Sequence, residues 1–177
     1  ILEQLGDFSE ESAEKLLTYL RHRHLIIEIK NDEQEDTRYK RQISYFDDMV
    51  LNRPGHETQK SLASKNIVIL GCGAVGSAIA DILARTGILR FVLLDYKNVT
   101  TESLHRHLHF TDKDINKSKV SALSDYLKSI NTLANIITHN DIILPNSDLS
   151  LWIPSDADIV INSCDEPYIG HTSLKIG

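Results

Sequence analysis

The chain has 177 residues and a net charge of −6, which is compatible with one full domain and a smaller appendage. This acidic balance argues against a nucleic-acid-binding surface, which needs a concentrated basic footprint. No apolar run reaches the length of a membrane span, and acidic residues interrupt the N-terminus, so neither a transmembrane segment nor a signal peptide is expected. Two cysteines are too few for a disulfide framework or a zinc site, so we expect free thiols and a cytoplasmic location.

Residues 1–36 are predicted to form a small module of their own. Residues 8–20 predict a helix, because Ser9 can cap its start and apolar residues recur on one face. A short strand is expected at Leu25–Ile29, and the acidic stretch 31–37 is typical of a linker. The module would therefore combine one helix with one strand, before a second domain that starts at residue 37.

From residue 37 onward, strand and helix patterns alternate. A turn at 52–56 precedes a predicted helix at 57–64, and the helix that follows the first strand is expected to end near Gly87. Apolar, β-branched runs predict buried parallel strands at 66–70, 91–94, 135–139 and 157–162. Two amphipathic helices are expected between them, with apolar stripes formed by Val75, Ile79, Ile82 and Leu83 and by Val120, Leu123, Leu127 and Ile130. The alternation predicts an α/β fold, a Rossmann-like, doubly wound and mostly parallel sheet.

A glycine loop joins the first of these strands to the following helix. Its sequence is Gly71-Cys72-Gly73-Ala74-Val75-Gly76, and this strand–loop–helix context is the one that a nucleotide-binding glycine motif requires. The glycines permit a tight turn, a close approach of backbone N–H groups to phosphate, and close helix packing. Asp95 ends the second predicted strand, where an acid can accept a hydrogen bond from a ribose hydroxyl. A nicotinamide dehydrogenase would have the same features, so the loop alone does not identify the nucleotide.

Five separated motifs narrow the choice of nucleotide. They are Arg38–Gln42, Asp95–Val99, Ser103–His107, Asp114–Val120 and Ser163–Asp165. In this order and spacing, from about residue 38 to residue 177, the chain resembles the adenylating family of ThiF, MoeB and the ubiquitin-activating enzymes. The resemblance implies an enzyme that binds ATP and Mg²⁺, joins AMP to the C-terminal carboxylate of a peptide or small protein, and releases pyrophosphate.

The resemblance also implies roles for individual residues. Arg106 and Lys119 would contact the phosphates, Asp95 would hold the ribose, and Asp165 would position magnesium. Arg41 matches an arginine that reaches into the partner subunit's site, so a homodimer is implied. The remaining nucleotide contacts are expected from Gly71, Gly73, Ala74, Val75, Gly76, Lys97 and Ser103. The fixed positive charges of Arg106 and Lys119 suit the attack of a carboxylate on a triphosphate, since both reactants are anions.

Three departures from the family pattern bear on activity. Lys97 stands where a second acid is usual, Ser103 where Asn is usual, and His107 where Gln is usual. A shifted nucleotide geometry, weaker activity or a non-catalytic relative would each fit them. A metal site formed by His105, His107 and His109 is a weaker alternative, because no cysteine lies nearby. Ordinary solvated roles for Arg106, Lys119 and Asp165 also remain open.

The N-terminal module gives a clue to the subtype. A helix and a strand before an acidic linker look like the peptide-adenylating enzymes of the MccB type, in which such a module can clamp the precursor peptide as an added strand. Peptide natural-product maturation is therefore favoured over sulfur-carrier or ubiquitin-like protein activation. Non-catalytic peptide binding and a nicotinamide oxidoreductase are further alternatives. We also expect a longer protein, with any structural zinc site beyond Gly177.

Overall fold

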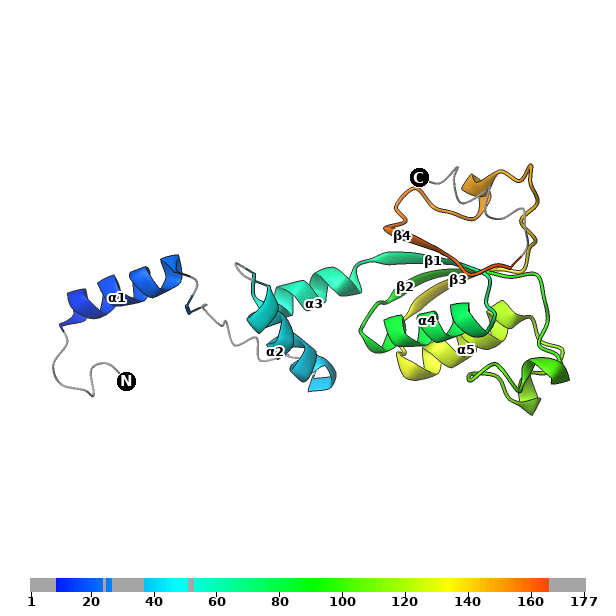
Figure 1. Ribbon diagram of the computed structural model, residues 1–177, viewed down its shortest axis with the longest axis horizontal. Helices are drawn as coiled ribbons and strands as arrows, with labels where there is room; N and C mark the ends of the chain where they lie inside the picture. Colours follow the sequence, from blue (N-terminus) through cyan, green and yellow to red (C-terminus); the bar gives the residue numbers. More distant parts are fainter. Residues whose placement is uncertain (1–8, 24, 27–36, 51–52, 166–177) are drawn as a thin grey trace. The chain divides into compact units, whose positions relative to one another are not determined.

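The computed structural model describes residues 9–23, 25–26, 37–50 and 53–165. The chain divides into two compact units, residues 1–60 and 61–177 (Figure 1), and each is described by itself. The domain boundary predicted at residue 36 and most of the strand predicted at 25–29 lie outside the described residues. Within the described part, no helix is long and apolar enough to cross a membrane.

The first unit is helical where it is described. Its helices are α1 (Glu10–His22), α2 (Lys40–Met49) and α3 (Gly55–Ala63), which runs into the second unit, and a 3₁₀ turn, η2 (Thr37–Tyr39), precedes α2. The predicted cap of α1 is confirmed, because the Ser9 hydroxyl accepts a hydrogen bond from the Ser12 N–H. Helix α2 was not predicted from the sequence, although Ile43, Phe46 and Val50 recur at helical spacing and are half-buried.

The second unit is built on a four-stranded sheet. Its strands are β1 (Asn66–Leu70), β2 (Arg90–Leu94), β3 (Asn135–His139) and β4 (Ile159–Asn162). All neighbours are parallel, and the order is β3-β2-β1-β4. The chain therefore starts in the middle, moves outward through β2 to β3, and then crosses to the other side of β1. This arrangement confirms the predicted doubly wound sheet.

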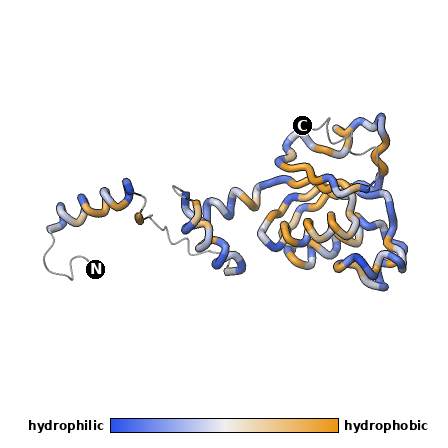
Figure 2. Tube along the Cα trace, viewed as in Figure 1, coloured by the Kyte–Doolittle hydropathy of each residue, from blue (hydrophilic) through white to orange (hydrophobic). Residues whose placement is uncertain are grey.

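The two faces of the sheet are covered differently. Helices α4 (Ala74–Arg85) and α5 (Lys119–Ile130) lie together on one face, and the segment 141–157 covers the other (Figure 1). Side chains alternate between these faces: Ile67 and Ile69 pack toward the helices, whereas Val68 and Leu70 pack with Ile143 on the opposite side. The two central strands, β1 and β2, are consequently hydrophobic and buried over almost their whole length, whereas the outer strands β3 and β4 are partly exposed, and Figure 2 shows the hydrophobic residues gathered in the sheet. Continuous apolar strands are typical where a sheet is buried on both faces.

The inward face of α4 differs from the predicted stripe. Val75 and Ile82 are 63% and 61% exposed, so their assignment to the core was wrong. The buried positions of this helix are instead small residues, namely Gly76, Ser77, Ala80 and Ala84. Small side chains let the helix backbone approach the sheet closely, and this close approach leaves no room for a row of branched side chains.

Several segments outside the helices and strands contain short 3₁₀ turns. Between β2 and α5 lie two short 3₁₀ turns, η3 (Thr101–Ser103) and η4 (Asp112–Asp114). A further 3₁₀ turn, η5 (Leu149–Leu151), lies in the segment 141–157. Trp152 packs on the sheet, whereas Leu151 is exposed.

Candidate functional site

A cavity opens where the chain reverses its direction across the sheet. Strands β2 and β4 flank β1 on opposite sides, and in such sheets ligands bind in the crevice at the carboxyl ends of these strands. The cavity measures about 280 Å³. Its lining residues come from the glycine loop, the ends of β2 and β4, the start of α5, the 104–110 loop and the 141–143 segment. Most of the predicted site residues therefore meet at one place.

The glycine loop forms one wall, and its three glycines meet different demands. Gly71 has φ +88°, and a Cβ there would lie 2.9 Å from the Cys164 Sγ, so the loop and the end of β4 need a glycine to approach each other. A Cβ on Gly76 would overlap the Gly71 carbonyl oxygen and the Ser163 Oγ. A Cβ on Gly73 would meet no heavy atom within 4 Å. The packing of the protein therefore does not require a glycine at position 73, and the space beside Gly73 is open to a ligand.

Asp95 fixes the geometry of this wall. Its Oδ2 accepts a hydrogen bond from the Cys72 N–H at 2.8 Å, and its Oδ1 accepts one from the Lys97 N–H at 2.8 Å. The residue is buried. The Cys72 thiol is also buried, and desolvation first, then the negative charge of Asp95, raises the pKa of this thiol well above its usual value. Cys72 is therefore a packing residue rather than a nucleophile.

Three cations line the cavity. Lys97 follows β2, Arg106 lies on the 104–110 loop, and Lys119 is the first residue of α5. Lys119 is only 6% exposed, while Arg106 is exposed. Among the described residues, neither Arg106 nor Lys119 has a carboxylate within ion-pair distance. Two positive groups therefore line the cavity without an ion pair to any described carboxylate, although Asp95, Asp141 and Asp165 line the same cavity, and they remain available to an anionic ligand.

Two further carboxylates lie on the cavity wall. Asp165 follows β4, as predicted, and Asp141 follows β3. The Asp141 Oδ2 accepts a hydrogen bond from the Trp152 Nε1–H at 3.2 Å. Within the described ranges, no group of three His, Cys, Asp or Glu side chains could hold a metal ion by itself. The donor set still suits Mg²⁺, which is commonly bound through one or two carboxylates together with the phosphates of a substrate.

The 104–110 loop, which carries Arg106, is fastened by two inward-facing histidines. His107 Nδ1 lies 2.7 Å from the Ser103 carbonyl oxygen, and its ring stacks on Phe110 with centroids 5.0 Å apart. Burial is the main cause that lowers the pKa of His107 below its usual value, and the positive charges of Lys119 and Arg106 act in the same direction. His107 thus lines the cavity as a buried imidazole.

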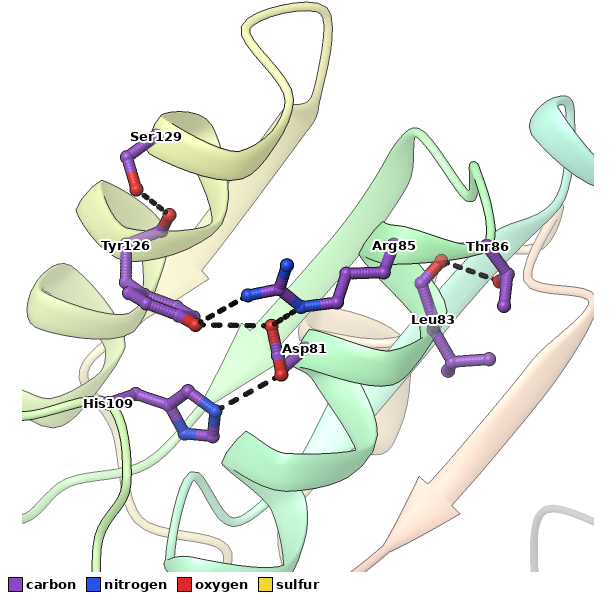
Figure 3. Close-up of polar contacts among 7 residues, drawn as sticks. All are labelled: Asp81, Leu83, Arg85, Thr86, His109, Tyr126 and Ser129. Atoms are coloured by element: carbon purple, nitrogen blue, oxygen red, sulfur yellow. Dashed lines mark hydrogen bonds and ion pairs between the residues drawn. The ribbon is translucent and has the colours of Figure 1, made fainter. Parts of the chain in front are cut away.

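His109 attaches the same loop to the helices, as Figure 3 shows. Its Nε2 lies 3.5 Å from the Asp81 Oδ2, and its ring contacts that of Tyr126. The other oxygen of Asp81 accepts hydrogen bonds from the Arg85 Nε–H at 2.8 Å and from the Tyr126 hydroxyl at 3.2 Å. The network joins the loop, α4 and α5, so His107 and His109 serve as internal anchors, while His105 is exposed.

Not every predicted residue lines the cavity. The Ser103 hydroxyl is buried in a turn, where it accepts the Thr100 N–H at 3.2 Å, and Gly76 packs behind the loop. Arg41 lies on α2, in the first unit. The sequence analysis missed Asp141, Ile142 and Ile143, which also line the cavity. Their position two to four residues after a parallel strand was the available signal, because such strands end at a shared edge.

Comparison with known proteins agrees with this geometry. The sequence matches the ThiF family over residues 39–172. Adenylyltransferase and sulfurtransferase MOCS3 of Anopheles gambiae is 31% identical over 158 residues, which cover 88% of this chain and 34% of that protein. Molybdopterin-synthase adenylyltransferase of Haemophilus influenzae is 28% identical over 163 residues, which cover 84% of this chain and 64% of that protein. The chain thus spans about a third of the length of the MOCS3 relative.

Solved structures share the fold. The crystal structure of E. coli MccB with ATP aligns with a TM-score of 0.69 at 23% identity, covering 96% of this chain and 50% of that one. PaaA aligns with a TM-score of 0.73 at 26% identity, covering 90% of this chain and 51% of that one. The resemblance inferred from the five motifs is confirmed, and the chain belongs to the ThiF family.

Proposed function

We propose that this protein binds ATP in the cavity and transfers AMP to the C-terminal carboxylate of a peptide or small protein, with release of pyrophosphate. The observation that carries the proposal is the pair Arg106 and Lys119, two cations that form no ion pair with a described carboxylate and lie in the same cavity as an open glycine loop. A triphosphate supplies the negative charge that they lack. The names of the curated relatives, which are adenylyltransferases, support the same reaction.

The nucleotide would lie along the cavity from an apolar end to a charged end. Leu94, Ile142 and Ile143 provide an apolar wall for the base. Asp95 keeps lone pairs for a ribose hydroxyl beyond the two N–H groups that it already accepts. The phosphates would lie between the start of α4, whose first N–H groups are unsatisfied, and the two cations. Gly71, Gly73, Ala74, Val75 and Lys97 complete the proposed nucleotide contacts.

The chemistry is a displacement at the α-phosphate. A carboxylate oxygen of the substrate forms a bond to the α-phosphorus, and the bond from that phosphorus to the bridging oxygen breaks, so that the electron pair leaves with pyrophosphate. Arg106 can hold phosphate oxygens through several N–H groups, and Lys119 acts as a point charge. Both stabilise the charge that develops in the transition state. Asp165 would hold Mg²⁺, which neutralises phosphate charge when bound.

The substrate class rests on different observations for the two candidates. Peptide natural-product maturation is favoured by the alignment with MccB, which extends over 96% of this chain. Activation of a small ubiquitin-like or sulfur-carrier protein is favoured by the sequence relatives. A cytoplasmic homodimer, in which Arg41 reaches the partner's site, belongs to the same proposal. A non-catalytic, peptide-binding relative is the alternative from another class.

ATP–pyrophosphate exchange tests the proposal directly. Labelled pyrophosphate should enter ATP only when a carboxylate substrate is present, because exchange needs the adenylate to form and reverse. Candidate peptides and small ubiquitin-like proteins, each with a free or an amidated C-terminus, distinguish the two substrate classes. The Arg106→Met and Lys119→Met variants should lose exchange, whereas the control Lys128→Met, on the far part of α5, should retain it.

Negative results are also informative. Exchange at background with a peptide that nevertheless binds would leave the non-catalytic alternative. Retention of NAD but not of ATP would overturn the nucleotide assignment and support an oxidoreductase.

A further inference from the structure

His107 has a hydrogen-bonding nitrogen that nothing in the described protein satisfies. The residue is 4% exposed and lines the cavity. Its Nε2 is buried without a hydrogen-bond partner. A buried polar atom without a partner carries an energetic cost, and native proteins usually retain such an atom only where a ligand or function uses it. The same cavity wall contains Arg106 and Lys119, so the bound group that completes His107 should be anionic.

The contact of the other ring nitrogen fixes the tautomer. Nδ1 lies 2.7 Å from the Ser103 carbonyl oxygen, and a carbonyl oxygen can only accept a hydrogen bond. Nδ1 must therefore carry a proton. In the neutral ring, Nε2 then has a lone pair and can only accept. A phosphate oxygen is also an acceptor, so it cannot pair with Nε2 until the ring gains a second proton.

We propose that His107 takes up a proton when the triphosphate of ATP enters the cavity, so that the imidazolium donates from Nδ1 to Ser103 and from Nε2 to a phosphate oxygen. The proton leaves again when pyrophosphate departs. His107 then contributes a charge that exists only while phosphate is bound, in addition to the permanent charges of Arg106 and Lys119. This inference rests on the proposed binding of ATP, but it does not depend on the transfer of AMP.

The surroundings of His107 favour a neutral ring in the free protein and a protonated ring when a triphosphate is bound. Burial is the main cause that lowers the pKa of His107 in the free protein, and the charges of Lys119 and Arg106 act in the same direction. The hydrogen bond to the Ser103 carbonyl and the charge of Asp95 oppose this lowering. A bound triphosphate would reverse the local charge and raise that pKa. Because bound ATP then favours protonation, affinity for ATP should fall as the pH rises.

Calorimetry of ATP binding measures the proton directly. The heat of binding of Mg-ATP to the chain is recorded at one near-neutral pH in two buffers with different ionisation enthalpies, and the difference gives the protons taken up. We expect about one proton per ATP for the wild type. His107→Gln supplies a neutral side chain that can donate without gaining a proton, so its uptake should be close to zero. The matched control is His105→Gln, an exposed histidine of the same loop, which should retain the wild-type uptake.

A second measurement covers the case in which His107→Gln does not fold. In wild-type protein with ¹⁵N-labelled histidine, the Nε2 resonance of one buried ring should change from a non-protonated to a protonated shift on addition of Mg-ATP. The inference is overturned if ATP binds without proton uptake, or if His107→Gln takes up as many protons as the wild type. Proton uptake without pyrophosphate exchange would overturn the proposed reaction and leave this inference standing. Failure of ATP to bind would overturn both.

Discussion

The backbone N–H of Cys72 donates a hydrogen bond to the Oδ2 of Asp95 at 2.8 Å, which ties the glycine loop to the end of the neighbouring strand. The Oδ1 of the same carboxylate accepts the Lys97 N–H. One side chain thus sets the position of two backbone segments that line the cavity. Asp95 therefore has a structural task besides the ribose contact proposed for it.

Substitution of Asp95 by Asn should reveal this task. An amide has one oxygen and one NH₂ group, so one of the two N–H groups loses its acceptor and meets a donor instead. An unsatisfied buried group costs about 1–3 kcal/mol, and we expect the free energy of unfolding in urea to fall by that amount. Asp165→Asn, which changes an exposed carboxylate of the same cavity, should leave stability within about 0.5 kcal/mol of the wild type. Equal stability of the two variants would contradict the structural role.

The glycines of the loop should separate folding from binding. In Gly76→Ala, the new methyl group overlaps the Gly71 carbonyl oxygen, and overpacking of this kind costs about 1–3 kcal/mol. In Gly73→Ala, the methyl group enters open space, so thermal stability should be retained while ATP affinity falls by about tenfold, or ~1.4 kcal/mol. Thermal unfolding with and without ATP measures both effects. Wild-type affinity in Gly73→Ala would show that phosphate does not approach this residue.

Lys119 should be required for function and dispensable for stability. It is buried and pairs with no carboxylate among the described residues, so Lys119→Met removes no ion pair. We expect unfolding free energy to stay within about 1 kcal/mol of the wild type or to rise, while ATP binding and exchange are lost. The control Lys117→Met breaks the contact with Asp114 at 3.0 Å outside the cavity, and it should bind ATP normally. A large loss of stability in Lys119→Met alone would argue for a packing role.

The depressed pKa of His107 predicts a pH dependence of the free protein. An unfolded histidine titrates near pH 6.5, and burial lowers the pKa of His107 in the folded state. The unfolded chain therefore binds more protons just below that pH. The stabilising contribution of the neutral ring is complete above about pH 6.5 and is lost as the pH falls through the folded-state pKa. Urea unfolding at a series of pH values should show the wild type losing stability relative to His107→Gln on acidification. A constant difference would contradict the lowered pKa.

Strong local patterns made most of the second unit predictable. The β-branched run before Gly71 and the alternation of strands with amphipathic stretches were sufficient for a parallel sheet, because burial on both faces demands continuous apolar strands. The inward face of α4 was misjudged, since hydropathy favours Val75 and Ile82 over the alanines that allow close packing. Helix α2 was missed because its first turn is charged, although its apolar spacing is helical.

The residues of the candidate site were harder to predict where they are brought together from distant parts of the sequence. Asp95 and the glycines follow from local order along the chain. Asp141 reaches the cavity only because β3 lies beside β2 and the following segment returns over the sheet. The burial of the Ser103 hydroxyl depends on a turn with Thr100, which a motif alignment does not show. The position of a side chain that depends on a local turn or on a neighbouring strand can be known only once the whole sheet is assembled.

The alternation along the 104–110 loop has a consequence for the entropy of binding. His107 and His109 face inward and are buried, whereas Arg106 is exposed and Leu108 is 87% exposed. The backbone freedom of this loop is therefore already lost on folding. Ligand binding needs to immobilise only the Arg106 side chain, at a cost of about 0.5–1.5 kcal/mol, instead of the ~1–2 kcal/mol per residue that ordering a loose backbone would require.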